Sequence, residues 1–289
     1  MGLTGPDVTC VWPLQCSLGE GPLWWAGSLW FTDIKQKKVH CFDPAGPSRS
    51  WAAPSEVGFL APLADGHFIA GTKAGLQDFD PATGAFTLIR EIEPDRPGNR
   101  LNDGAVDTKG RLWFGSMDDG ETSPSGKLYR LYRGELSAMD AGYIITNGPA
   151  FSPDGRVLYH TDTLARRIYA FDLDPDGGLA NKRIFAQIED GYPDGPIVDQ
   201  EGCVWTGLFG GWGVRRYSPQ GRLEHTVPFP VANVTKLAFG GPELKTVYAT
   251  TARKGLDAAA LAAQPLAGGL FCFAADTPGQ SGVAAAAGG

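Results

Sequence analysis

The sequence predicts an all-β fold, a six-bladed β-propeller with four antiparallel strands in each blade. The first observation is a strand with an aromatic or β-branched centre that recurs six times, each copy starting 38 to 47 residues after the one before. The copies occupy residues 28–33, 66–71, 110–115, 155–160, 202–207 and 245–250. A repeat of this length indicates a propeller or a solenoid before any other fold.

The second observation is that another strand follows each copy. These strands occupy residues 38–43, 75–80, 127–132, 167–172, 213–218 and 269–273. Most of them alternate polar and apolar residues, as half-buried strands do. A further strand precedes the Gly-containing turn before each aromatic strand, and an outer strand ends each repeat. Each repeat thus has four strands, and six such repeats specify the propeller. We therefore expect one domain that spans residues 1–289.

The ends of the chain carry predictions of their own. Residues 9–14 precede the first complete blade, and we expect them to close the ring as the outer strand of the last blade, which removes an exposed sheet edge. The only helical pattern of note lies around residues 257–264. Residues 283–289 are rich in Ala and Gly, so we expect this tail to be frayed.

Two blades are longer than the minimal repeat between their second and third strands. Blade three inserts residues 116–126, and blade six inserts residues 252–268. Loops on one end of a rigid scaffold commonly shape a binding pocket. A surface insertion that is merely tolerated is the alternative, and for blade six the two interpretations are equally good.

Composition excludes several classes of partner. The chain has 289 residues, 43% of them hydrophobic and 20% charged, and a formal net charge of −7. Nucleic acids and anionic membranes require a basic face, so neither is expected as a partner. No signal peptide or apolar run of membrane-spanning length is visible. The five scattered cysteines are expected to be reduced thiols, which favours a cytoplasmic protein, and a monomer is the default expectation.

One phrase recurs at the start of four repeats: a side chain with an oxygen atom, then Gly, then a small residue or Pro. The copies begin at Glu20, Asp103, Asn147 and Asp194. The innermost strand of each propeller blade lines the central channel, so we expect these side chains at the ends of the innermost strands to converge on the axis. Taken alone, each copy could simply be a turn-forming sequence. Several copies in the same register favour a binding site instead.

The remaining two blades offer different residues in this position, Leu60 or Ala61 in blade two and Thr235 or Lys236 in blade six. Several carboxylates in a narrow channel are costly to bury without a cation. Carboxylate and amide oxygens are ligands for hard or borderline divalent ions. The sequence therefore predicts one divalent metal ion, with Fe²⁺, Ca²⁺, Mn²⁺, Zn²⁺ and Mg²⁺ all open.

Four motifs together resemble the SMP-30/gluconolactonase family, which includes regucalcin-like proteins. They are Glu20-Gly21-Pro22, Arg100-Leu101-Asn102-Asp103-Gly104, Thr146-Asn147-Gly148-Pro149 and Tyr192-Pro193-Asp194-Gly195. The resemblance covers residues 9–275. Within the family the chain is most similar to bacterial sugar lactonases of pentose oxidation, and the segments 233–236 and 251–256 contribute to that likeness.

The resemblance implies a role for each site residue. The metal ligands would be Glu20, Asn147 and Asp194, and Arg100 and Asn102 would face the substrate. The same comparison moves Asp103 out of the ligand set to a supporting or turn-forming role. An acidic substrate contact follows the Gly-Ser-Met segment at 115–117, and the alignment there leaves Asp119 and Glu121 open.

The implied function is hydrolysis of a sugar lactone, most specifically D-xylonolactone to D-xylonate. Gluconolactonase and L-arabinolactonase activities are the alternatives, together with a non-catalytic metal-binding propeller. Lactone hydrolysis passes through an oxyanion that a metal stabilises, and Asp194 is predicted to act as both ligand and general base. The chain has no Gly-x-Ser-x-Gly motif, which argues against a serine hydrolase.

Overall fold

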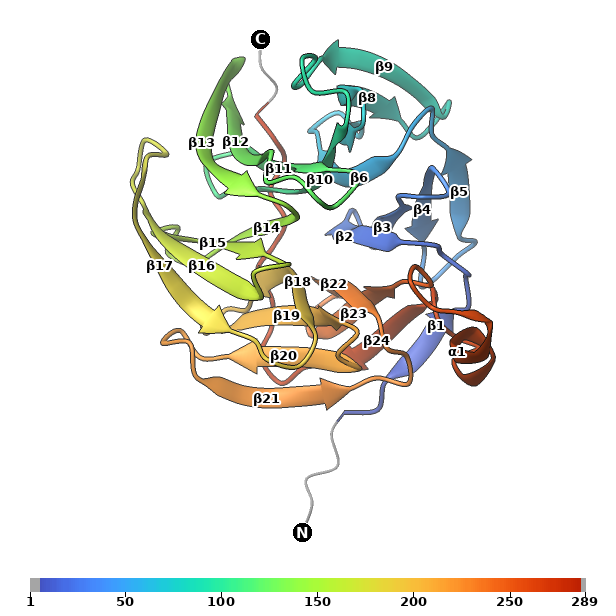
Figure 1. Ribbon diagram of the computed structural model, residues 1–289. Helices are drawn as coiled ribbons and strands as arrows, with labels where there is room; N and C mark the ends of the chain where they lie inside the picture. The colour runs from blue at the N-terminus through green and yellow to red at the C-terminus, as the bar shows by residue number, and fades with distance from the viewer. Residues whose placement is uncertain (1–5, 287–289) are drawn as a thin grey trace.

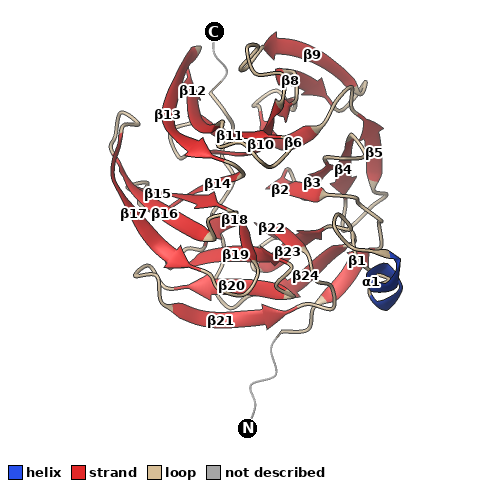
Figure 2. Cartoon of the chain, viewed as in Figure 1, coloured by secondary structure: helices blue, strands red, loops and turns tan. Residues whose placement is uncertain are grey.

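The computed structural model describes residues 6–286, which form six four-stranded antiparallel sheets arranged around a central channel (Figure 1). Almost all of the regular structure in this range is strand, and one short helix lies at the outer edge of the ring (Figure 2). The all-β, six-bladed prediction is confirmed. Over the described range, no helix combines the length and the apolar character needed to cross a membrane.

The first three blades follow one another along the chain. Blade one contains β2 (Gly19–Trp25), β3 (Ser28–Asp33), β4 (Lys38–Phe42) and β5 (Arg49–Ala52). Blade two contains β6 (Val57–Pro62), β7 (Phe68–Thr72), β8 (Gly75–Asp80) and β9 (Ala85–Arg90). Blade three contains β10 (Asn99–Val106), β11 (Leu112–Asp118), β12 (Gly126–Tyr132) and β13 (Glu135–Tyr143).

Blades four and five repeat the pattern, and blade six joins the two ends of the chain. Blade four contains β14 (Thr146–Phe151), β15 (Val157–Asp162), β16 (Arg167–Leu173) and β17 (Leu179–Gln187). Blade five contains β18 (Tyr192–Val198), β19 (Val204–Phe209), β20 (Gly213–Tyr217) and β21 (Leu223–Pro228). Blade six contains β22 (Val234–Gly240), β23 (Thr246–Thr251), β24 (Leu270–Ala274) and β1 (Thr9–Trp12).

The ring closes as the sequence predicts. Strand β1 pairs antiparallel with β24, with Thr9 opposite Cys272, so the N-terminal strand is the outer strand of blade six. This pairing covers the edge that β24 would otherwise expose. The helical pattern is also confirmed, because α1 (Ala258–Ala263) lies inside the blade-six insertion and the side chain of Asp257 caps its first turn.

The core lies between neighbouring sheets. Phe59 of blade two packs on Phe114 of blade three, with ring centroids 5.9 Å apart, and Trp205 of blade five meets the edge of Phe239 of blade six at 6.0 Å. Such aromatic contacts add to the burial of large apolar surfaces. They hold the blades at fixed angles and so fix the positions of the strands that line the channel.

The innermost strands that carry the recurring phrase have a β-bulge there. The pairing register shifts between Glu20 and Leu23 in β2, between Asn147 and Ala150 in β14, and between Pro193 and Pro196 in β18. A bulge bends the strand and re-aims its side chains. In these three strands the polar residue is the second or third residue, so it lies at the strand end as predicted, and the bulge adjoins it.

Blade two differs from the expectation. Its register shift falls at Gly58, and Leu60 and Ala61 lie further along β6, beside the opposite end of the channel. A Cβ atom on Gly58 would stand 2.2 Å from the backbone oxygen of Asn102, so only glycine fits there. The innermost strand of blade two therefore places no oxygen-bearing side chain at this position of the repeat.

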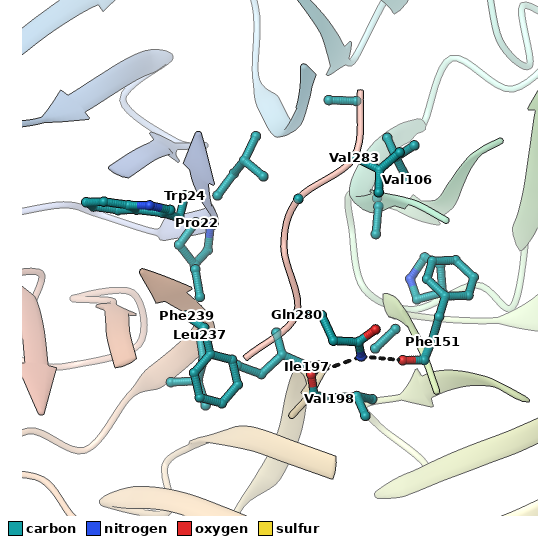
Figure 3. A pocket seen from close by; sticks show the side chains of 18 of the residues that line it. Pro22, Trp24, Val106, Phe151, Ile197, Val198, Leu237, Phe239, Gln280 and Val283 are labelled. Atoms are coloured by element: carbon teal, nitrogen blue, oxygen red, sulfur yellow. Dashed lines mark hydrogen bonds between the residues drawn. The ribbon is translucent and has the colours of Figure 1, made fainter. Parts of the chain in front are cut away.

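The C-terminal segment crosses the channel at the end where the innermost strands finish (Figure 3). Gln280 Nε2 donates hydrogen bonds to the backbone oxygens of Phe151 (2.9 Å) and Val198 (3.1 Å), and the Ala285 amide donates to Pro62. Together with apolar side chains of the inner strands, this segment lines a cavity of about 200 Å³. The expectation of a frayed tail is wrong for residues 283–286; residues 287–289 lie outside the described range.

Candidate metal centre

The polar residues gather at the other end of the channel, where the innermost strands begin. We call this the upper end. The register pairs Asn99 with Asp118 and Val234 with Thr251, so the insertions of blades three and six both leave their sheets at the upper end. Rigid strands thus carry the candidate ligands, and longer loops form the rim above them.

The three predicted ligands come from three blades and are all buried. Glu20 lies on β2, Asn147 on β14 and Asp194 on β18, and their exposed fractions are 4%, 2% and 6%. Asn147 Nδ2 donates to the Thr163 hydroxyl at 2.9 Å, which orients its amide oxygen toward Asn102. The structure thus brings two carboxylates and one amide oxygen to the same end of the channel.

The two carboxylates are in an unfavourable environment without a cation. Burial raises the pKa of Glu20 well above its ordinary value, and the charges of Asp194 and Asp103 raise it further. Burial and the charge of Asp103 likewise raise the pKa of Asp194. Asp194 Oδ1 is buried and accepts no hydrogen bond from any described residue. A buried acceptor with no donor is costly, and a divalent ion would satisfy it.

A hydrogen-bonded chain connects the ligand Asn147 to the rim. Asn102 Nδ2 donates to Asn147 Oδ1 at 3.0 Å and to the Thr146 backbone oxygen at 2.6 Å. Arg100 Nη1 donates to Asn102 Oδ1 at 2.6 Å. Arg100 is only 3% exposed, so it makes this contact in a buried position. Both predicted substrate residues therefore lie beside the candidate metal ligands.

The structure separates Asp119 from Glu121. Arg100 Nε donates to Asp119 Oδ1 at 2.8 Å, whereas Glu121 forms an ion pair with Lys254. Burial raises the pKa of Asp119, but the hydrogen bonds and charges of Lys35 and Arg100 outweigh this and hold that pKa below its ordinary value. Of the two carboxylates that the alignment left open, Asp119 is the one connected to the site.

Asp103 has a different environment from the three ligands. Its Oδ1 accepts from the Gly104 amide at 2.7 Å and forms an ion pair with Lys236, and its Oδ2 accepts from the Gly148 amide at 2.6 Å. Both oxygens are therefore occupied by protein donors. This geometry agrees with a supporting position for Asp103 and not with a place among the ligands.

Four lysines complete the site and were not assigned roles from the sequence. Lys35 and Lys73 contact Asp119 at 2.6 and 3.4 Å, Lys254 contacts Glu121, and Lys236 contacts Asp103. Lys35 and Lys73 follow the second strands of blades one and two, the same place in the repeat as the two long insertions. Aligning the repeats at this turn is the signal that would have found them.

A second acidic cluster lies in blade five and is not part of this centre. Asp199, Glu201 and Cys203 lie close enough to hold an ion. The guanidinium of Arg216 already occupies this position, with contacts of 2.9 Å to Asp199 and 2.6 Å to Glu201. The positive charge of Arg216 takes the place that a cation would have, so the channel is the better candidate.

A six-bladed propeller with carboxylate and amide oxygens at one end of its channel is the class of protein that the fold and the site define. The family model of the SMP-30/Gluconolactonase/LRE-like region matches residues 18–253. The chain therefore belongs to the SMP-30/gluconolactonase family, as its motifs predict.

Individual relatives cover nearly the whole chain. It is 38% identical to L-arabinolactonase of Azospirillum brasilense, covering 88% of this chain and 87% of the relative. It is 33% identical to 6-deoxy-6-sulfogluconolactonase of Pseudomonas putida, covering 93% and 95%. A solved regucalcin of Agrobacterium tumefaciens, described as a calcium-binding protein, has a TM-score of 0.93 and 30% identity, covering 98% of both chains.

Proposed function

We propose that this protein is a metal-dependent hydrolase that opens sugar lactones. The observation that carries the proposal is the buried, unpartnered Oδ1 of Asp194, which lies with Glu20 and Asn147 at the upper end of the channel and beside the Arg100–Asn102 pair. Two of the curated relatives are named as sugar lactonases, which supports the same class of reaction.

The residues at the upper end suit one divalent ion, held by Glu20, Asn147 and Asp194. An ion bound there would polarise an ester carbonyl and lower the pKa of a bound water molecule. Oxygen ligands accept Ca²⁺, Mg²⁺, Mn²⁺, Fe²⁺ or Zn²⁺, and availability decides among them as much as affinity does. The calcium-binding description of the solved regucalcin makes Ca²⁺ one of the ions to test first.

The side chains then divide the work of hydrolysis. Asp194 accepts the proton of the attacking water at its carboxylate, a form of general-base assistance that contributes typically 10²–10⁴-fold to the rate. Arg100 carries a fixed positive charge and Asn102 an amide, and both are buried at the site where polar substrate groups would lie. Asp119 holds Arg100 in place by accepting a hydrogen bond from Arg100 Nε.

D-xylonolactone is the substrate that we propose, with D-xylonate as the product. Segments 233–236 and 251–256, which carry the resemblance to pentose lactonases, lie at the upper end, where Asn233 Nδ2 donates to the Lys254 backbone oxygen at 3.0 Å. These residues support the proposal because they border the rim that a sugar would meet. L-Arabinolactone and gluconolactone remain the alternatives within the same reaction class.

A specific observation favours a second candidate, a lactone that carries an anionic group. Above the candidate ligands, four cationic side chains, Lys35, Lys73, Arg100 and Lys254, pair with only two carboxylates, Asp119 and Glu121. This excess of positive charge would attract an anionic substituent. One relative is named for such a substrate, 6-deoxy-6-sulfogluconolactone.

One experiment separates these candidates. Purified protein loaded with each divalent ion is assayed by pH-stat against D-xylonolactone, L-arabinolactone, gluconolactone and 6-deoxy-6-sulfogluconolactone. The proposal expects the highest kcat/KM on D-xylonolactone, whereas preference for the sulfonated lactone would establish the second candidate. If the metal-loaded protein opened none of these lactones, the result would favour a non-catalytic propeller.

Asp194→Asn tests the mechanism directly. We expect lactone opening to fall by at least ~10²-fold, because the amide cannot accept the proton, while the melting temperature stays close to that of the unaltered protein. Asp65→Asn, in the exposed turn between β6 and β7, is the matched control and should retain the full rate. Near-native turnover of Asp194→Asn with metal still bound would remove Asp194 from the base role.

A further inference from the structure

One buried cation lies among the acidic residues of the channel. Lys236 is on β22 of blade six, inside the bulge between Val234 and Leu237, so it has the same place in its blade as the ligands have in theirs. Its side chain is only 6% exposed and forms an ion pair with Asp103, whose side chain is 1% exposed. A lysine is rarely buried this deeply unless its charge is paired.

The pair connects three blades around the ligands. Asp103 of blade three also accepts a hydrogen bond from the backbone amide of Gly148, the residue after the ligand Asn147. The stem of Lys236 lies against Gly195, the residue after the ligand Asp194. A Cβ atom on Gly195 would stand 2.6 Å from Lys236 Cδ and 3.0 Å from Asp103 Oδ2. The pair is therefore packed directly beneath two of the three ligands.

The charges of the buried residues also draw attention to Lys236. Glu20, Asp103 and Asp194 bring three carboxylates, and within residues 6–286 Lys236 is the one ammonium group that forms an ion pair with any of them. A divalent ion together with Lys236 balances three carboxylates, whereas the ion alone leaves one negative charge buried. Unbalanced buried charge is strongly unfavourable.

We propose that Lys236 is a positioning residue that keeps Asp103 from becoming a fourth ligand. By occupying Asp103 Oδ1, it limits the ion to Glu20, Asn147 and Asp194 and leaves coordination positions open for water and substrate. Catalytic metal sites need such open positions, whereas closed sites are structural. The inference rests on the metal centre of the proposed function, but it concerns ion binding and can be tested without any lactone.

The test uses three variants of the full chain after removal of metal: Lys236→Met, Asp103→Asn and the double variant. Mn²⁺ affinity is measured from the electron paramagnetic resonance signal of the free ion, and thermal melting of the metal-free proteins is recorded alongside. Lys236→Met removes the positive charge beside Asp103 and leaves its carboxylate only the two backbone amides, so it should tighten Mn²⁺ binding by about tenfold or more. Asp103→Asn leaves an unpaired cation near the ion and should weaken binding by a similar factor.

The double variant removes both charges and should return the Mn²⁺ affinity to within about threefold of the unaltered protein, because the opposed effects cancel. A purely structural role for the pair would lower melting temperatures without changes of opposite sign in affinity. If Lys236→Met does not fold, the proposal stands or falls on the weaker Mn²⁺ binding of Asp103→Asn and its recovery in the double variant.

The outcomes also separate this inference from the proposed function. Weaker Mn²⁺ binding in all folded variants, or failure of the double variant to recover affinity, would overturn the role of Lys236. If the unaltered protein binds no divalent ion, the inference is overturned together with the metal centre. Binding with the expected opposite shifts but without lactone opening would support Lys236 and refute the hydrolase alone.

Discussion

At the scale of single residues, His160 shows how a buried group outside the site controls stability. It lies on β15 with no exposed surface, its ring meets the edge of Tyr143, and neither ring nitrogen has a hydrogen-bond partner among the described residues. Burial lowers the pKa of His160 to about 3 from an ordinary value of 6.5. The folded protein therefore holds this imidazole neutral, and acid favours the unfolded chain.

The sign of the pH dependence follows from this lowered pKa. Between pH 6.5 and 3 the unfolded chain binds the proton and the folded protein does not, so stability is full above pH 6.5 and falls as the pH decreases. His160 alone should remove about 1.5 kcal/mol between pH 6.5 and pH 5. We expect His160→Phe to flatten this slope in urea unfolding curves, whereas His225→Phe, at an exposed position of β21, should leave it unchanged. An unchanged slope in His160→Phe would show that other groups govern acid unfolding.

Single residues also show what the sequence could and could not predict about the site. The repeat register predicts that Glu20, Asn147 and Asp194 lie at one end of the channel, together with Asp103, but it was the family resemblance that separated these three candidate ligands from Asp103. The ion pair between Lys236 and Asp103 joins residues 133 positions apart, and no local pattern encodes such a partner. The repeat register left Thr235 and Lys236 as the two candidates for this position in blade six. Only the packed channel shows which carboxylate Lys236 contacts.

At the scale of elements, the repeat was predictable and the details of the strands were not. Six aromatic strands, their partners and the closing strand β1 all follow from periodicity, because hydrophobic alternation and turns are local properties. The bulges in the innermost strands are invisible in that pattern, since a bulge is defined by the partner strand. The tail shows the same limit: its composition suggested fraying, but Gln280 finds backbone oxygens of two blades that only the closed ring presents.

The two inserted loops provide an element-scale test of the rim. Asp119, just after β11, binds the buried Arg100, whereas Glu121 joins the blade-three loop to Lys254 of the blade-six loop at a partly exposed position. Asp119→Asn should lower kcat/KM for the preferred lactone by about 10–100-fold, because it weakens a charged hydrogen bond to a buried side chain. Glu121→Gln should change it by about threefold at most, since exposed ion pairs contribute little.

These two variants are compared by initial-rate measurements at several lactone concentrations, with circular dichroism to establish that both fold. The pair is a matched control in itself, because both changes replace a carboxylate by an amide within three residues of one loop. A larger loss in Glu121→Gln than in Asp119→Asn would show that contact between the two loops, and not the support of Arg100, determines activity.

At the scale of the whole molecule, the proposed metal centre would link the blades, because its candidate ligands come from blades one, four and five. An ion that binds only the folded ring stabilises it by mass action, by about 2.7 kcal/mol when its concentration is 100 times Kd. The same ion would offset the negative charges of Asp194 and Asp103, which together with burial raise the pKa of Glu20 above its ordinary value. Stability and metal binding should therefore change together.

This coupling gives the final prediction. The melting temperature of chelator-treated protein should rise as the binding ion is added, and Glu20→Gln should lose most of that rise because it removes one ligand charge from the channel. Glu201→Gln is the matched control: Glu201 lies in the blade-five cluster, where Arg216 supplies the positive charge, so the ion-dependent rise should persist. Calorimetric scans with and without the ion measure both variants. If Glu201→Gln, and not Glu20→Gln, abolished the rise, the ion would bind in blade five and the channel assignment would be wrong.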